Sequence, residues 1–428
     1  MKKKLDLMTN VVLLTVDSLR SDHCSCYGYD RETTPELDSL SMNGTRFMNA
    51  YSPSSHTRES VPAFLSGQYP HAAVDDGYHL AAPTLATHLS ESHHTGAFHS
   101  NPFISRAYGF DNGFDVFDDD LYIGQHRLLA LAQRLWDKIR NHHYARAESI
   151  NSRALDWLDS LPDDESFFLW NHYMDTHGPY EPPEPYRSKW TGQSISGRKA
   201  QNLYDRALSD PGSITTAERQ LLIDLYDGEI RYTDAQIRKL LDELADRDYL
   251  EETLVLVTSD HGDGLGDNGQ YGHPRYLHDE LVTVPLMMNN PDDAGGRVSN
   301  VPVSGLDIAP TVLSAVGRES ADLPGVSLRQ VLSDESTFEE RCIILEARGE
   351  NENSDRRRYR VVDGESEFMF ERTLSEATQP DEDDSDPLAQ RLMGHLNLVN
   401  KRRDTGEVYT REGEANEISD RLEALGYK

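Results

Sequence analysis

The residues best suited to chemistry are acidic and histidine side chains that close two runs of apolar residues. Asp17 ends the run at residues 11–16, and Asp260 and His261 follow the run at 253–258. Carboxylate oxygens and an imidazole nitrogen suit a divalent cation such as calcium, magnesium, manganese or zinc. Each residue alone is equally typical of a helix cap or a turn. Their shared position at the ends of buried strands is what indicates a metal site.

Thr57 lies in a segment that could hold an anion. The sequence SSHTRESVPAFLSG at 54–67 predicts a helix over 58–65 with Thr57 at its N-cap. A helix start offers N–H donors and the positive end of the dipole, and Arg58 adds charge for a phosphate or sulfate. A neighbouring metal would lower the pKa of the Thr57 hydroxyl and make it a nucleophile. The structural alternative is an ordinary capping threonine.

The elements that must position these residues alternate between strands and helices. Apolar runs predict strands, and periodic patterns between them predict helices. This alternation indicates an α/β fold, an open parallel sheet with helices on both faces, in which ligands bind outside the carboxyl ends of the strands. The predicted strands are 10–16, 167–170 and 253–258, and the predicted helices are 34–42, 58–65, 85–91, 125–161 and 216–246.

The composition changes near residues 323–325, which read Leu-Pro-Gly. Beyond this point we expect short strands at 342–345, 359–362 and 367–370, with a turn at 363–364, an acidic loop at 381–386 and a terminal helix at 415–425. The predicted organisation is a catalytic domain over 1–330 and a small subdomain of antiparallel sheet and helix over 331–428.

The charge of the chain is strongly acidic. Its 428 residues include 74 acidic and 42 basic ones, for a formal charge of -32, and only nine are lysines. We favour a solvated surface suited to a high-salt, halophilic cytoplasm over an acidic partner-binding surface. Such a surface should repel nucleic acid and anionic lipid. Oligomeric state is not predicted.

Other features of the composition bear on location. Three cysteines cannot make a disulfide framework. The apolar run that follows the basic start is too short for an export signal or a membrane span. We therefore expect a soluble cytoplasmic protein with no membrane span.

Several motifs together resemble the sulfatase family of the alkaline phosphatase superfamily. They occur in family order between about residues 10 and 330, and they are specific as a set although each is weak alone. The resemblance implies an alkaline-phosphatase-like fold, a mostly parallel sheet flanked by helices. The motifs are NVVLLTVDSLRSDH at 10–23, CYGY at 26–29, TPELD at 34–38, LSGQYP at 65–70, SDHG at 259–262, VPL at 284–286 and GLDIAPT at 305–311.

The resemblance also assigns roles to single residues. Thr57 falls on the family's nucleophile position, where it would also contact the metal. The metal ligands would be Asp17, Asp260 and His261. By the same resemblance, His177 would contact the ester or protonate its leaving group, and His273 stands where sulfatases usually carry a lysine or histidine and could also protonate the leaving group. Both histidines are alternatively candidate ligands of a second metal ion. Asn101 lies where the family contributes substrate-binding side chains.

The chain departs from true sulfatases at the nucleophile. Those enzymes convert cysteine or serine in a Cys/Ser-x-Pro-x-Arg pattern to formylglycine, whereas this chain has Thr57 and carries Val61 in place of the arginine. Ser18 stands where many sulfatases have a second aspartate. A threonine nucleophile resembles the phosphodiesterase, phosphonate monoester hydrolase and phosphoglycerol transferase branches.

The predicted function is a metal-dependent hydrolase of sulfate or phosphate esters that forms a covalent Thr57 intermediate. Its substrate would be a small-molecule or glycan ester, with a phosphodiester slightly preferred. One alternative is a phosphoglycerol- or phosphoethanolamine-type transferase that uses the same intermediate. Another is a non-catalytic relative that binds anionic glycans.

Overall fold

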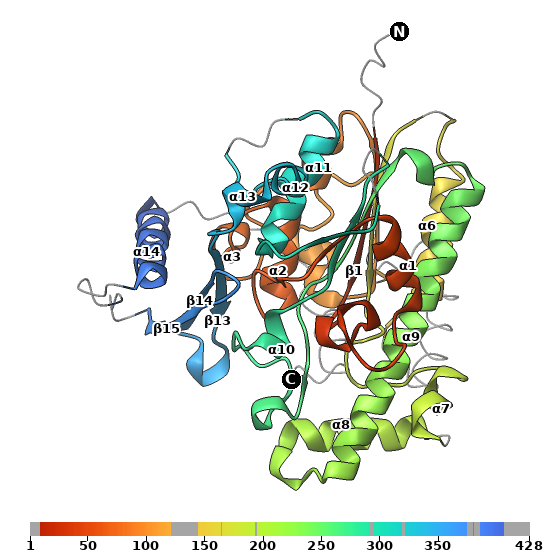
Figure 1. The fold of residues 1–428 in the computed structure, drawn as a ribbon, viewed down its shortest axis with the longest axis vertical. Helices are drawn as coiled ribbons and strands as arrows, with labels where there is room; N and C mark the ends of the chain where they lie inside the picture. The colour runs from red at the N-terminus through yellow and green to blue at the C-terminus, as the bar shows by residue number, and fades with distance from the viewer. Residues whose placement is uncertain are drawn as a thin grey trace.

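The computed structural model describes residues 9–120, 144–163, 165–192, 195–291, 295–318, 322–374, 380 and 386–405. Its main feature is an eight-stranded sheet in the order β11-β2-β10-β7-β1-β6-β4-β5 (Figure 1). The central strand β1 pairs in parallel with β6 and β7, and β4 and β5 continue the parallel part. Strand β10 runs antiparallel to both of its neighbours, β7 and β2. The strands are β1 Asn10–Val16, β2 Thr45–Phe47, β4 His94–Phe98, β5 Val116–Asp118, β6 Phe167–Tyr173, β7 Thr253–Ser259, β10 Leu286–Asn289 and β11 Arg297–Ser299.

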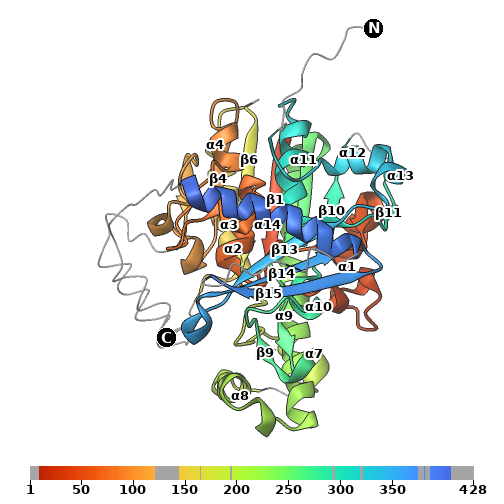
Figure 2. The ribbon, with the colours of Figure 1, turned by 90° about the vertical axis from the view of Figure 1, so that its left-hand side faces the viewer.

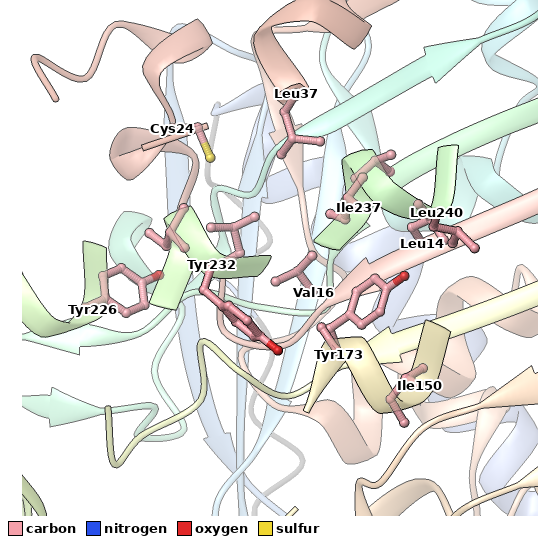
Figure 3. Close-up of a cluster of buried hydrophobic side chains, with 14 of the residues drawn as sticks. Leu14, Val16, Cys24, Leu37, Ile150, Tyr173, Tyr226, Tyr232, Ile237 and Leu240 are labelled. Atoms are coloured by element: carbon pink, nitrogen blue, oxygen red, sulfur yellow. The ribbon is translucent and has the colours of Figure 1, made fainter. Parts of the chain in front are cut away.

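Strand β1 is buried on both faces, as its continuous apolar sequence predicts. Val12 and Leu14 point into one core, and Val11 and Leu13 point into the other. The first core packs against α1, α6 and α9, and Figure 3 shows Leu14 in it beside side chains of α6 and α9. The second packs against α2, α4, α11 and α12. The α/β class with helices on both faces is confirmed.

The helices agree with the expected ones in most places. Helix α9 has the predicted bounds, and the described part of the long helix predicted over 125–161 is α6, since residues 121–143 lie outside the description. In the described part of the chain, no helix is both long and apolar enough to cross a bilayer. The α-helices ahead of the C-terminal sheet are α1 Pro35–Asn43, α2 Thr57–Ser66, α3 Pro70–Ala73, α4 Leu85–Leu89, α6 Ala147–Leu158, α7 Tyr186–Thr191, α8 Gly197–Ser209, α9 Thr216–Asp246, α10 Asp279–Val282, α11 Ile308–Ala315, α12 Leu328–Ser333 and α13 Glu335–Phe338.

The C-terminal part contains the expected antiparallel sheet. It is formed by β13 Ile343–Arg348, β14 Arg356–Val362 and β15 Glu367–Thr373. Helix α14 Pro387–Thr405 covers one face (Figure 2), and its residues Leu388, Leu392 and Leu396 pack on β14 at helical spacing. This helix was not anticipated, and the helix predicted over 415–425 lies outside the described residues. The two short two-stranded sheets pair β3 Ala50–Tyr51 with β12 Val303–Ser304 and β8 Gly264–Leu265 with β9 Tyr271–Gly272.

Candidate active site

Asp17, Thr57, Asp260 and His261 meet at the carboxyl ends of β1 and β7. Asp17 follows β1 directly, Asp260 follows β7, and Thr57 begins α2. The Thr57 hydroxyl donates to Asp260 Oδ2 at 2.7 Å and lies 3.2 Å from His261 Nε2. Ligand atoms of Asp17, Asp260 and His261 all lie within 4.8 Å of one another, and each of these residues is fully buried. The sequence therefore identified residues that the fold brings together.

The start of α2 differs from the prediction. The helix begins at Thr57 itself, and the N-cap is His56, whose Nδ1 accepts a hydrogen bond from the Arg58 amide at 3.2 Å. This hydrogen bond, together with those from the Glu59 and Ser60 amides to the His56 carbonyl, satisfies the first donors of the helix without the threonine hydroxyl. As a result, Thr57 is not the capping residue, and its hydroxyl is directed to Asp260.

The turn after β1 joins the two carboxylates through Ser18. Its backbone N–H donates to Asp260 Oδ1 at 3.1 Å, and its hydroxyl donates to Asp17 Oδ1 at 2.9 Å. Ser18 has a φ of +60°, a conformation that is uncommon for residues other than glycine. The Tyr226 hydroxyl donates to the Ser18 carbonyl at 2.6 Å and anchors the turn. Ser18 thus supplies no carboxylate but holds both carboxylates in place.

Asn101 and His172 fix the other oxygen of Asp17. Asn101 Nδ2 donates to Asp17 Oδ2 at 2.8 Å, and His172 Nε2 lies 3.1 Å from the same atom. The His172 Nδ1 is 2.8 Å from the Thr15 hydroxyl on the paired strand. The Asn101 side chain therefore faces a carboxylate, where we had expected it to face substrate. His172 was missed, although its place near the carboxyl end of a buried strand was a signal.

The site has an excess of buried negative charge. Burial and then the charge of Asp17 raise the pKa of Asp260. Burial works to raise the pKa of Asp17 as well, but the hydrogen bond from His172 and the charge of His177 hold it below its ordinary value. Two adjacent buried carboxylates need a nearby cation.

His261 completes a donor set that fits a divalent cation. Its Nδ1 lies 2.7 Å from the Gly262 carbonyl, to which it donates, and this leaves Nε2 directed at the carboxylates. Burial works to lower the pKa of His261, but the charges of Asp260 and Asp17 raise it. Two carboxylates and a neutral imidazole with an oriented second nitrogen are typical of metal ligands. The residues present therefore fit such an ion.

Two further histidines border the site. His177 Nε2 and His273 Nε2 are 3.1 Å apart, and His177 Nδ1 lies 2.7 Å from the Gly178 carbonyl. The His273 ring centroid is 4.6 Å from that of His261. A hydrogen bond between two imidazole nitrogens requires a proton on one of them. Burial, followed by the charges of His261 and His177, lowers the pKa of His273 well below its ordinary value.

Arg58 follows Thr57 in the first turn of α2. Its guanidinium lies 3.9 Å from the ring centroid of Phe103 and 5.1 Å from that of Tyr78. Stacking on aromatic rings holds the guanidinium group near the helix start. All the residues expected at the site are thus in one region, where the Asn101 amide donates to Asp17.

Comparisons of the sequence with known proteins identify its family. The sulfatase family model matches residues 9–318. The uncharacterized sulfatase YidJ of Escherichia coli K12 is 23% identical over 75% of this chain and 71% of its own length. The low-salt glycan biosynthesis sulfotransferase Agl7 of Haloferax volcanii is 26% identical over 65% of this chain and 57% of its own length.

Solved structures share the fold at low sequence identity. The phosphonate monoester hydrolase of Agrobacterium radiobacter superimposes with a TM-score of 0.67 and 18% identity, over 92% of this chain and 96% of that one. The related enzyme SpPMH of Silicibacter pomeroyi gives a TM-score of 0.62 at 20% identity, over 94% and 96% of the two chains. Because the family model matches well over half of the sequence, the chain belongs to the sulfatase family of ester hydrolases.

Proposed function

We propose that this protein is a metal-dependent hydrolase of sulfate or phosphate esters that forms a covalent intermediate on Thr57. The observation that carries the proposal is the placement of the Thr57 hydroxyl between Asp260 Oδ2 and His261 Nε2. A hydroxyl in that position touches both a proton acceptor and the candidate metal ligands.

The metal would be held by Asp17, Asp260 and His261, with Thr57 beside it. When bound, a divalent cation lowers the pKa of the threonine hydroxyl and offsets charge on the ester oxygens. The surrounding residues keep the ligands in place, since Asn101, His172 and Ser18 each hydrogen-bond to Asp17.

Each bond in the reaction has a group beside it that can assist. Thr57 Oγ gives its proton to Asp260 Oδ2 and attacks the sulfur or phosphorus atom. A bond forms to that atom, and the bond to the leaving oxygen on the opposite side breaks. The leaving oxygen takes its proton from the His177–His273 pair. Arg58 and the positive end of the α2 dipole offset the charge that develops on the transferred group. Water then attacks the same atom and gives a proton to the histidine pair, while Thr57 Oγ leaves and takes back its proton from Asp260. This step frees Thr57 and releases sulfate, or a phosphate monoester when the substrate is a phosphodiester.

The choice of ester follows from the nucleophile. Threonine cannot become the formylglycine of true sulfatases, so we prefer a phosphodiester-type substrate, either a small molecule or a glycan ester. The likeness to phosphonate monoester hydrolases supports phosphorus as the reacting centre, whereas the sulfatase-named relatives support sulfur. Calcium, manganese, magnesium and zinc are all compatible with the ligand set.

A transferase is the second candidate, and the name of one relative favours it. Agl7 of Haloferax volcanii is named as a sulfotransferase of glycan biosynthesis. In a transfer reaction an acceptor hydroxyl takes the place of water at the second step, as in phosphoglycerol or phosphoethanolamine transfer. Products that form only when a sugar or glycerol acceptor is added would establish the transferase.

The charge of -32 with few lysines supports a high-salt cytoplasm as the setting of the protein.

The test compares matched aryl sulfate, phosphate monoester and phosphate diester substrates on metal-loaded protein. We expect turnover of at least one of them, fastest for the diester, and a mass increase on Thr57 in rapidly quenched samples. The variant Thr57→Ala should lose both signals while keeping its melting temperature, and Thr57→Ser should keep part of the activity. Undiminished turnover by Thr57→Ala would refute the covalent mechanism. Tight metal binding without hydrolysis of any ester would favour the non-catalytic, glycan-binding alternative.

A further inference from the structure

A second buried cluster of histidine and carboxylate lies where the C-terminal part meets the main domain. Glu346 on β13 receives His71 from α3 and His395 from α14. His71 Nδ1 is 2.8 Å from Glu346 Oε1, and His395 Nε2 forms a short hydrogen bond with the same oxygen. The His71 backbone N–H donates to Glu346 Oε2 at 3.0 Å. Both carboxylate oxygens are therefore held by groups from separate segments.

The cluster is sheltered from water. The side chains of His395 and Glu346 are 3% and 7% exposed, and that of His71 is 18% exposed. The Tyr69 ring packs edge-on against His395 with centroids 4.4 Å apart. Burial alone works to raise the pKa of Glu346, but His71 and His395 hold it well below its ordinary value. The carboxylate is therefore kept ionised, as a metal ligand must be.

We propose that His71, Glu346 and His395 form a second metal site, separate from the active site, which takes a divalent transition-metal ion of the zinc class. Two imidazole nitrogens and one carboxylate oxygen are a ligand set that zinc accepts, whereas calcium and magnesium favour oxygen ligands. The three ligand atoms lie within 4.8 Å of one another. A tetrahedral zinc ion with bonds of about 2.0–2.2 Å needs ligand separations of roughly 3.4 Å, which small side-chain rotations would provide. The partly exposed side of His71 leaves a place for water as the fourth ligand.

Such an ion would act as a structural clamp. Glu346 is 275 positions from His71 and 49 from His395 in the chain, so one ion would join segments that are far apart in sequence. Helix α3 follows α2, the helix that begins at Thr57. The metal ion would therefore link the C-terminal sheet to the segment that carries the proposed nucleophile. The free energy of binding would then add to the stability of the folded chain. A triad held only by hydrogen bonds is the competing description.

The first measurement counts metal ions on the full-length protein. In the Asp260→Asn variant, which weakens the active site, we measure bound Zn²⁺ per chain after chelation and reloading, and the absorption spectrum with Co²⁺. We expect the count to fall by one when His71→Gln or His395→Gln is added. Adding His88→Gln, which changes a half-buried histidine on α4, should leave the count unchanged. An equal zinc count in the His71→Gln and His88→Gln proteins would overturn the proposal.

The second measurement does not depend on counting. Zn²⁺ should raise the melting temperature of the Asp260→Asn protein by several degrees, and this rise should vanish when His71→Gln is added. Because His71 is the most exposed ligand, that variant is expected to fold even if His395→Gln does not. A zinc-induced rise of the same size with and without His71 would show that the triad is held by hydrogen bonds alone.

Discussion

The active-site cluster and the His71–Glu346–His395 cluster are built from the same side-chain types in opposite proportions. Around Thr57, two carboxylates share one ligating histidine, and the pKa of Asp260 is raised by burial and by Asp17. Where α3, β13 and α14 meet, two histidines share one carboxylate, and His71 and His395 hold the pKa of Glu346 low despite its burial. The first arrangement leaves negative charge for a cation to balance, as chemistry on anionic esters requires. The second offers a ligand set richer in nitrogen, as suits the zinc-class ion proposed there.

The largest expected effect is on the active-site side of this comparison. Asp260→Asn should lower kcat/KM by at least about 10³-fold, because it removes both a candidate metal ligand and the acceptor of the Thr57 hydroxyl. Its melting temperature without metal should not fall, since a buried like charge beside Asp17 is removed. Steady-state kinetics and thermal unfolding measure the two effects. Activity within tenfold of the parent protein would contradict the assignment.

A smaller loss is expected for the histidine pair. His177→Gln and His273→Gln should each lower kcat by about 10²–10⁴-fold on esters with poor leaving groups, because the leaving oxygen then lacks a proton donor. Substrates with nitrophenol leaving groups should lose much less, since those leave without protonation. The measurement is kcat across a series of aryl esters of increasing leaving-group pKa. A fall in kcat of the same size for all leaving groups would show that His177 and His273 do not protonate the leaving oxygen.

A substitution at Asn101 tests whether this residue contacts substrate, as the sequence predicts, or orients Asp17, as its hydrogen bond in the structure indicates. Since Asn101 donates to Asp17 Oδ2, Asn101→Ala should weaken active-site metal binding by about 10–100-fold. Activity should then return at saturating metal, with KM for the ester nearly unchanged. Metal titrations at several substrate concentrations separate the two effects. A raised KM that excess metal does not restore would instead support substrate contact.

Glu346→Gln should lower stability and leave activity nearly unchanged, which is the reverse of the effect expected for Asp260→Asn. It should destabilise the protein by about 1–3 kcal/mol, because the buried His395 and the partly buried His71 lose their charged acceptor. Its kcat/KM should stay within about twofold of the parent value in conditions where the chain is folded. Denaturant unfolding and steady-state kinetics on the same sample test this. A large loss of activity without loss of stability would make the contrast between the clusters wrong.

The smallest effect concerns a buried carboxylate outside both clusters. Asp234 accepts hydrogen bonds from the Glu36 and Leu37 amides and pairs with Arg231, yet burial raises its pKa to about 7. A carboxyl group whose pKa is raised on folding adds most to the stability of the folded protein at pH values below its unfolded pKa, which is near 4. This stabilisation is lost as the pH rises through the folded pKa of about 7. Unfolding free energies at pH 4–8 should therefore decline less in Asp234→Asn than in the parent. Equal slopes would contradict the raised pKa.

The local sequence carried much information about the elements that position the active site. The apolar run at 10–16 could only be buried, and it became the central strand. Asp17 and Asp260 follow parallel strands, so their meeting at one edge was predictable once the strands were identified. The antiparallel strand β10 was missed because its four residues carry no periodicity of their own.

Contacts between distant segments were not predictable in the same way. A threonine before a helix indicates a cap, and only packing decided that His56 caps α2 and frees Thr57. The same holds for Asn101, whose amide could have faced substrate but is turned to Asp17 by the surrounding fold.

The sequence by itself determined the α/β class, the family and the four residues at the centre of the candidate active site, because strand ends and motifs are read directly from the order of residues. Tertiary structure alone decided which groups orient those residues, and it alone brought His71, Glu346 and His395 together. These three side chains stand on separate elements with no shared motif, and so their meeting depends on how α3, β13 and α14 pack.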